Sequence, residues 1–309
     1  MNKTDKGLHQ RNPHNAPYDF EELILAKPEL KLFVNLNKYQ NLSIDFSNPE
    51  AVLLLNKALL SHFYKIKNYD IPKGSLCPPI PGRADYLHYM ADVLAGEGKI
   101  PQGKQVKVLD IGTGANLIYP LLGASIYGWS FVGVDTEEKS LKSAQNIINN
   151  NPNFKDLITC RLQDNLENVL FGVLKKDEYF ELTICNPPFH KSYKEASAGT
   201  IRKNKNLGKK NEKLLNFGGE ANELWYPGGE ISFITKMIKQ SATRAKNCLW
   251  FSSLVSKKEN LSVIYKVLKQ FKAIEVKTIE MKQGQKLTRI VAWTFLNKEA
   301  QKKWKEKWA

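Results

Sequence analysis

The amino-acid sequence predicts an α/β protein: a doubly wound, mostly parallel sheet of seven strands, with an antiparallel C-terminal hairpin and an N-terminal helical extension. From Val106 onward, short β-branched runs alternate with helical stretches, which is the pattern of a parallel sheet with crossover helices. The last two apolar runs are joined only by a turn around Gly284-Gln285. This turn is too short for a parallel crossover, so these runs should pair antiparallel.

Residues 1–98 are expected to form an arm and a small helical lobe. The first fifteen residues are rich in Lys, Asn, His and Pro without apolar periodicity, and we interpret them as an arm. Helical spacing of apolar residues then runs from Phe20 to about Ala95. One helix should span Ala51 to Tyr64 behind the start signal Ser47-Asn48-Pro49-Glu50, and another should span Ala84 to Leu94.

Residues 99–309 should form the sheet domain, with a basic insertion at 190–228 that lacks clear periodicity. Trp304 and Trp308, four residues apart in the tail, favour an amphipathic turn packed on the sheet, with a nucleic-acid contact as the alternative. The expected strands are 106–111, 130–134, 157–162, 179–185, 248–254, 273–281 and 288–296, and the expected helices lie near 116–126, 137–149, 165–174, 230–245 and 258–270.

The composition limits the classes of function. The 309 residues carry 46 Lys and Arg against 31 Asp and Glu, so the net charge of +15 favours a polyanionic partner such as nucleic acid. No run of about 18 apolar residues and no signal-peptide pattern occurs, so we expect a cytoplasmic protein without membrane contact. The four cysteines lack C-x-x-C spacing, which favours reduced core thiols over a metal site.

A glycine turn follows the first predicted strand of the sheet domain. The segment Asp110-Ile111-Gly112-Thr113-Gly114 places two glycines where the chain turns from strand to helix and can approach a ligand closely. A dinucleotide site would require a further glycine where Leu117 stands, so an adenosylmethionine site fits better than an NAD site. The alternative is a tight turn without a ligand.

Carboxylates end the next strands. Asp135 closes the second strand, where an acceptor for two ribose hydroxyls is expected, although it can also cap the following helix. Gln163 and Asp164 end the third strand and could contact the adenine of the cofactor, with helix capping as the alternative for Asp164. The sequence therefore predicts a cofactor site along one edge of the sheet.

The segment Asn186-Pro187-Pro188-Phe189 closes the fourth strand and suits methylation of a planar, conjugated amine. Such an amine is a poor nucleophile because its lone pair is delocalised into the ring. The Asn186 side-chain oxygen and the Pro187 carbonyl can each accept one amine hydrogen, and Pro187 and Pro188 stiffen the loop in advance. Phe189 offers a ring for stacking. Asn186 should also border the cofactor; the alternative is a plain Asn-Pro turn.

No histidine is required as a base, because the amine nitrogen becomes acidic enough to lose its proton to water once methylated. The residues expected to hold nucleic-acid phosphates are basic and lie in the arm and the insertion: Arg11, Lys191, Lys194, Arg202, Lys203, Lys205, Lys209 and Lys210.

Segments spread over nearly the whole chain make the sequence similar to a known family, the adenine-N6 methyltransferases of 23S ribosomal RNA called ribosomal large subunit methyltransferase F, which is related to methyltransferase-like RNA enzymes of animals. The matching segments are Leu8-His9-Gln10-Arg11-Asn12 with Tyr18-Asp19-Phe20, Ser43-Ile44-Asp45-Phe46 with Asn48-Pro49-Glu50-Ala51-Val52, Pro79-Ile80-Pro81-Gly82-Arg83-Ala84-Asp85-Tyr86-Leu87-His88, Asp110 to Asn116 with Tyr119-Pro120-Leu121-Leu122-Gly123, Cys185 to His190, and Arg289-Ile290-Val291-Ala292-Trp293.

The resemblance implies a Rossmann-like class I methyltransferase fold that uses S-adenosyl-L-methionine to modify one adenine, adenine 1618 in the usual numbering of 23S rRNA. It also implies an N-terminal extension that covers the cofactor and contacts RNA, with Arg83 at the cofactor carboxylate. An ordinary salt bridge is the alternative for Arg83. The implied partner is 23S rRNA or a large-subunit assembly intermediate. Separately from the resemblance, we expect a monomer without a metal.

Other functions compete with this interpretation. The same loop chemistry could act on adenine in DNA or on a protein glutamine, and a non-catalytic RNA-binding scaffold with a vestigial pocket belongs to a different class. An NAD oxidoreductase would require a glycine at position 117, where this sequence has Leu117.

Overall fold

The computed structural model describes residues 7–73, 75–192, 195, 225–284 and 286–308. Its main sheet has seven strands in the order β5-β4-β3-β6-β7-β9-β8, of which the first five run parallel and β9 pairs antiparallel with both β7 and β8. The predicted fold class is therefore confirmed. The strands are β3 (Lys107–Ile111), β4 (Ser130–Asp135), β5 (Ile158–Leu162), β6 (Phe180–Cys185), β7 (Cys248–Val255), β8 (Glu275–Gln283) and β9 (Lys286–Thr294).

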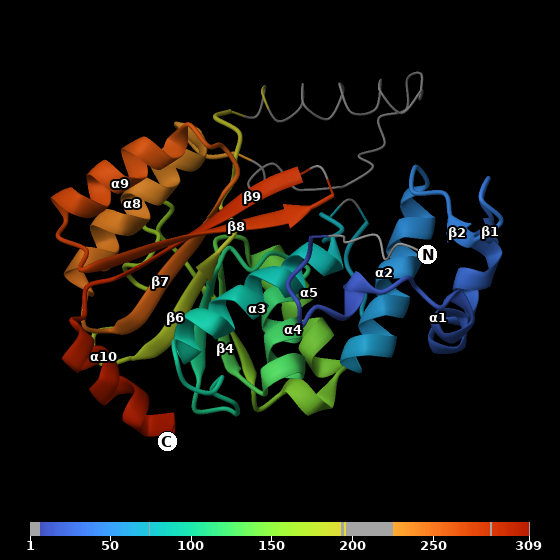
Figure 1. Ribbon diagram of the computed structural model, residues 1–309, viewed down its shortest axis with the longest axis horizontal. Helices are drawn as coiled ribbons and strands as arrows, with labels where there is room; N and C mark the ends of the chain where they lie inside the picture. The colour runs from blue at the N-terminus through green and yellow to red at the C-terminus, as the bar shows by residue number, and fades with distance from the viewer. Residues whose placement is uncertain (1–6, 74, 193–194, 196–224, 285, 309) are drawn as a thin grey trace.

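Helices cover both faces of this sheet (Figure 1). One buried cluster joins one face to α3, α4 and α5, and a second joins the other face to α8 and α9. The fully buried rings of Trp129, Trp250 and Trp293 are among the largest side chains in the two clusters. The helices are α3 (Ile80–Ala95), α4 (Ile118–Tyr127), α5 (Glu138–Asn149), α8 (Gly229–Thr243), α9 (Asn260–Gln270) and α10 (Lys298–Lys305).

The N-terminal lobe lies at one end of the molecule (Figure 1). Its helices α1 (Phe20–Ala26) and α2 (Pro49–Tyr64) flank a two-stranded hairpin of β1 (Val34–Leu36) and β2 (Leu42–Ile44). The sequence pattern missed this hairpin because its strands are only three residues long. Helix α3 begins at Ile80 rather than Ala84, since proline is well tolerated in a first helical turn.

Residues 7–15, which the sequence predicts as an arm, are docked against α3 instead. The His9 backbone N–H and the Asn12 side-chain amide both donate to Asp85 Oδ1, at 2.9 and 2.5 Å. Burial raises the pKa of Asp85, and these two donors oppose the shift. Polar residues thus hold this segment against α3. Hydrophobic periodicity could not predict this docking for that reason.

The predicted helix at 165–174 is wrong. The Gln240 side-chain oxygen accepts hydrogen bonds from the backbone N–H groups of Val169, Leu170 and Phe171 at 2.9, 2.7 and 3.3 Å, in place of helical partners. Gly172 has a φ of +85°, which also ends any helix. The apolar residues of this loop still fill the core against α8, so the burial pattern resembled that of a helix.

The C-terminal tail packs on the sheet as expected. Trp304 in α10 and Trp308 in the 3-10 turn that follows it (Glu306–Trp308) are partly buried against the core, and Trp304 Nε1 donates to Glu181 Oε1 at 3.0 Å. Cys185 and Cys248 are buried in strands, and all four cysteines are free. Within the described residues, no helix is long and apolar enough to cross a membrane.

Candidate active site

The glycine turn and the Asn-Pro-Pro-Phe loop lie side by side at the carboxyl edge of the sheet. Strands β3 and β6 are parallel neighbours, with Ile111 and Cys185 as register partners. Gly112 follows Ile111 and Asn186 follows Cys185, so the two segments leave adjacent strands at the same level. The sheet order reverses between these two strands, which is where open α/β sheets bind ligands.

The glycine turn adopts the backbone that its sequence predicts. Gly112 and Gly114 have φ values of +74° and +65°, a region that favours glycine. The N–H groups of Gly112 and Thr113 donate to the Val134 carbonyl at 2.9 and 2.8 Å, which ties the turn to β4. Apart from its two chain neighbours, no described residue has an atom within 4 Å of the position that a Cβ of Gly112 would occupy. The turn therefore borders open space.

Asp135 lies directly against this turn. Its Oδ2 accepts from the Gly114 N–H at 2.8 Å, and its Oδ1 accepts from the Glu137 N–H at 3.0 Å. Burial raises the pKa of Asp135, while these backbone donors oppose the shift. The carboxylate thus stabilises the entry to α5 and still lines the edge where a ribose is expected.

Asp110 is the most unusual group of the site. Its side chain is fully buried, and burial raises its pKa to about 7. Neither carboxylate oxygen has a hydrogen-bond partner of normal geometry among the described residues, although the Thr113 hydroxyl is near enough to oppose the shift. A buried carboxylate without partners is destabilising by itself, which indicates a site prepared for a ligand that carries donors or positive charge.

Arg83 reaches the same site from the first turn of α3. Its Nη1 donates to the Tyr119 hydroxyl at 2.6 Å, and the guanidinium lies 5.3 Å from the centre of that ring. Its positive charge opposes the rise in the pKa of Asp110 that burial causes. No carboxylate of the described part of the chain forms a salt bridge with Arg83, so the ordinary salt bridge considered as an alternative is not found there.

A hydrogen-bond chain that sequence reasoning missed fixes the start of the Asn186 loop. The Ser252 hydroxyl donates to the Thr183 carbonyl at 2.6 Å, so the Tyr86 hydroxyl, 2.8 Å away, donates to Ser252. Tyr86 can then accept the Cys185 N–H at 3.3 Å. Tyr86 is fully buried and lies one helical turn beyond Arg83, so α3 positions both sides of the site. In the sequence, the only indication of this role was that a tyrosine stands three residues after Arg83.

In the loop itself, Pro187 is buried, whereas Asn186, Pro188 and Phe189 are partly exposed. No hydrogen bond joins the Asn186 side chain to another described residue, so its amide is available at the edge. The rings of Phe189 and His190 meet edge to face with centroids 5.1 Å apart. The described residues thus present an amide and an aromatic ring together.

Gln163 and Asp164 take different roles at the end of β5. Gln163 is buried, and its amide donates to the Phe171 carbonyl at 2.8 Å, which holds the loop after β5. Asp164 is exposed. Their contact with a cofactor stays a prediction, and Gln163 supports the site through this loop.

The predicted RNA-binding residues are only partly described. Lys191 is exposed, and its N–H donates to Glu195 Oε2 at 2.8 Å. Arg11 has partners within the protein: Asp92 at 2.7 Å and the His88 carbonyl at 2.8 Å. Their contact with RNA stays a prediction. The remaining candidates lie outside the described residues: Lys194, Arg202, Lys203, Lys205, Lys209 and Lys210.

A glycine turn and an amide-bearing loop on adjacent parallel strands, within this strand order, define a Rossmann-like methyltransferase. The chain matches the model of a family described as RNA methyltransferase over residues 2–297, and it belongs to that family. The expected class of enzyme is thereby confirmed.

Known proteins with similar sequences carry a common name. The chain is 54% identical to the ribosomal RNA large subunit methyltransferase F of Flavobacterium johnsoniae, covering 98% of each chain. It is 53% identical to the protein of that name from Photobacterium profundum, covering 97% of this chain and 95% of the other. The family resemblance noted in the sequence is therefore confirmed.

Solved structures show the same fold. The catalytic domain of human METTL16 in complex with a MAT2A 3′UTR hairpin aligns with a TM-score of 0.79 and 29% identity, over 95% of this chain and 97% of that one. The N-terminal domain of human METTL16 in complex with SAH aligns with a TM-score of 0.73 and 27% identity, over 94% and 99%.

Proposed function

We propose that this protein transfers a methyl group from S-adenosyl-L-methionine to the exocyclic N6 amine of a single adenine in 23S ribosomal RNA, adenine 1618 in the numbering that the family resemblance implies. The observation that carries the proposal is the register of Ile111 with Cys185, which sets Gly112 and Asn186 directly after the ends of adjacent strands. Relatives at 53–54% identity named as ribosomal RNA methyltransferases support the substrate.

The residues of the glycine turn fit this cofactor. Asp110 offers a buried carboxylate with unused acceptors, Gly112 borders open space, and Arg83 has donors for a carboxylate. In this proposal Asp135 accepts from the ribose hydroxyls, Gly114 shapes the turn, and Gln163 and Asp164 border the adenine. When bound, S-adenosyl-L-methionine supplies an electrophilic methyl group.

The Asn186 loop prepares the amine for attack. The Asn186 side-chain oxygen and the Pro187 carbonyl each accept one hydrogen of the adenine amine, which directs its lone pair toward the glycine turn. Pro187 and Pro188 fix these acceptors in advance, and Phe189 stacks on the extruded base, a contact worth about 1–3 kcal/mol. As the new carbon–nitrogen bond forms, the methyl–sulfur bond breaks and the nitrogen releases one proton to water.

The RNA is held mainly by charge. We propose that basic residues of the 190–228 insertion neutralise phosphates while the adenine leaves its stack, a step that costs a few kcal/mol and less in a loop than in a duplex. The partner is 23S rRNA or an assembly intermediate of the large subunit, and the enzyme acts in the cytoplasm as a monomer.

The test is to supply radiolabelled methyl donor with separated rRNA, DNA and protein from cells that lack the enzyme. The proposal requires label in 23S rRNA as N6-methyladenine at one position, mapped by mass spectrometry of fragments. Label in DNA or protein alone would contradict it, and the absence of both label and cofactor binding would indicate a non-catalytic scaffold.

A further inference from the structure

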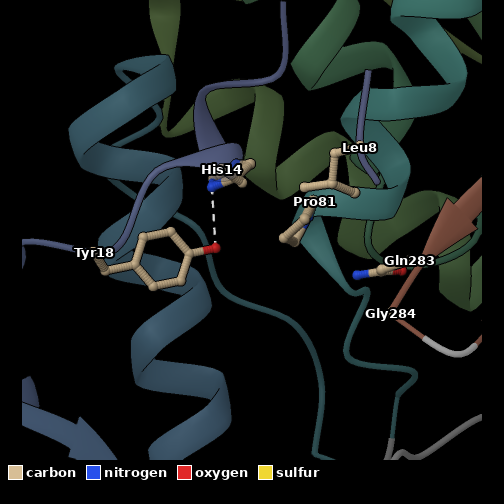
Figure 2. Close-up of a pocket in the computed structure, with 6 residues that line it drawn as sticks. All are labelled: Leu8, His14, Tyr18, Pro81, Gln283 and Gly284. Carbon is tan, nitrogen blue, oxygen red and sulfur yellow. Dashed lines mark hydrogen bonds between the residues drawn. The ribbon is translucent and has the colours of Figure 1, made fainter. Parts of the chain in front are cut away.

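A cavity of about 160 Å³ lies beside the first turn of α3 and takes no part in the chemistry proposed above (Figure 2). Three segments far apart in the sequence form it: the docked N-terminal segment, the start of α3 and the turn between β8 and β9. Its lining residues are Leu8, His14, Tyr18, Pro81, Gln283 and Gly284.

The cavity adjoins the candidate active site. Pro81 lies two residues before Arg83 on α3, and Arg83 acts electrostatically on Asp110. Gln283 lies against the same turn, because a Cβ added at Gly82 would be 2.7 Å from its Oε1. The cavity and the cofactor residues therefore share one helical turn.

The β8–β9 turn also lies at the carboxyl edge of the sheet. Strand β9 pairs antiparallel with β7, with Arg289 opposite Val255, the last residue of β7. The residues of β9 before Arg289 therefore extend past the end of β7, on the side where the parallel neighbour β6 ends at Cys185. RNA whose target base reaches Asn186 would pass this turn.

The lining is apolar and aromatic with one available amide. Leu8 and Pro81 supply aliphatic surface, and Tyr18 presents its ring. The Tyr18 hydroxyl is joined to His14 at 3.1 Å, and the other His14 nitrogen is joined to the Tyr64 hydroxyl at 2.8 Å. By contrast, no hydrogen bond links the exposed Gln283 carboxamide to another described residue. No lining side chain is a Lys, Arg, Asp or Glu.

We propose that this cavity binds the base of one RNA nucleotide that flanks the target adenine, stacked on Tyr18 and recognised by Gln283. The volume is below the 300–1,000 Å³ of pockets for larger ligands and suits a single planar ring. A carboxamide offers one donor and one acceptor, the pair that Gln uses on an adenine edge, and the uncharged lining disfavours a phosphate. Sequence-specific readers of RNA recognise splayed bases in this way.

This inference rests on the proposed function and adds a source of sequence selectivity to it. Phosphate contacts orient an RNA without identifying its sequence, whereas a base contact outside the reaction centre selects one adenine among many. We expect the flanking base to contribute a factor of at least about five in affinity, the lower limit for stacking of one base.

The experiment uses the full-length enzyme and the shortest 23S rRNA fragment that it methylates. Copies of this fragment, each with one abasic nucleotide near the target, are titrated by fluorescence anisotropy against wild type and Gln283→Ala. We expect one flanking position at which the abasic change weakens wild-type binding at least about fivefold. In Gln283→Ala the intact fragment should bind more weakly, and the sensitivity at that position should decrease, because the amide contact is lost while stacking on Tyr18 remains.

Matched variants separate recognition from folding. Gln145→Ala changes an exposed glutamine on α5 and should keep the wild-type pattern. Tyr18→Phe keeps the ring and should also keep the wild-type pattern of sensitivity to abasic positions. Tyr18→Leu removes the ring and should lose that pattern. Thermal melting of each variant checks that the fold is intact.

The outcomes distinguish the two proposals. A fragment that is methylated, but whose abasic sensitivities are the same in Gln283→Ala and wild type, overturns the cavity assignment alone. If Gln283→Ala weakens the binding of every abasic fragment by the same factor, the cavity assignment is also overturned, because the Gln283 amide then does not contact one particular base. If no rRNA fragment accepts a methyl group, the proposed function fails and this inference fails with it.

Discussion

The backbone N–H of Cys185 donates to the hydroxyl of Tyr86 across 3.3 Å, and Cys185 is the residue that immediately precedes Asn186. Tyr86 belongs to α3, 99 residues away in the sequence. Helix α3 therefore positions the loop that is proposed to hold the substrate amine, in addition to carrying Arg83.

Replacing Tyr86 with Phe should slow turnover more than it weakens cofactor binding. The ring is kept, but the Cys185 N–H and Ser252 each lose a partner, so the Asn186 loop becomes less fixed. Small displacements of groups that position substrates lower rates by up to about a hundredfold, and we expect a decrease in kcat of about tenfold or more. Steady-state kinetics with both substrates measures this.

Tyr89→Phe is the matched control, because it removes a hydroxyl from the same helix without touching Cys185. An unchanged kcat in Tyr86→Phe, or an equal loss in Tyr89→Phe, would show that the hydrogen bond to Cys185 does not position the loop.

Replacing Asp110 with Asn should stabilise the protein without cofactor at neutral pH. The raised pKa means that the native protein keeps a proton on Asp110 where the unfolded chain has lost it. The wild type thus loses stability as pH rises from about 4 to about 7, and this loss is complete above pH 7. At pH 8 the gain should be on the order of 2–4 kcal/mol.

Urea unfolding of both proteins at pH 8 and pH 5 tests this effect, and the advantage of Asp110→Asn should shrink at pH 5. Cofactor affinity should fall in the same variant. A stability difference that does not vary with pH would show that Asp110 is not held protonated by burial.

The salt dependence of rRNA binding should show that lysines of the basic insertion neutralise phosphates. Each phosphate neutralised on a single strand contributes about 0.7 to the slope of log affinity against log salt concentration. The double variant Lys209→Ala and Lys210→Ala should lower the slope by up to about 1.4. Anisotropy titrations at several salt concentrations measure it, and an affinity independent of salt would contradict the electrostatic account.

Trp304→Phe should destabilise the fold without changing turnover of the folded enzyme. Burial raises the pKa of Glu181, and the N–H groups of Trp304 and Lys107 both donate to its carboxylate, at 3.0 and 2.6 Å. Loss of one donor to a buried group costs about 1–3 kcal/mol. Chemical denaturation with an activity assay checks both parts, and a loss of kcat without a loss of stability would place the tail in the reaction.

The sequence was sufficient to predict the fold and the adjacency of the two motifs, because buried parallel strands leave clear apolar runs and their carboxyl ends share one edge. It did not reveal Tyr86, whose partners Cys185 and Ser252 are 99 and 166 residues away. It also missed the docking of His9 and Asn12, since buried polar residues are recognised only through their partner Asp85. The false helix at 165–174 arose because the side chain of Gln240 satisfies that backbone in place of a helix.

The most direct test of the central claim is turnover of Asn186→Ala together with calorimetry of S-adenosyl-L-methionine binding. Asn186 is proposed to accept a hydrogen bond from the adenine amine, while the glycine turn and Arg83 hold the cofactor. In Asn186→Ala, methyl transfer to 23S rRNA should therefore be almost abolished and cofactor affinity largely kept. Asn186→Asp, which retains an acceptor oxygen, should keep measurable turnover. Methyl transfer by Asn186→Ala at the wild-type rate would contradict the account.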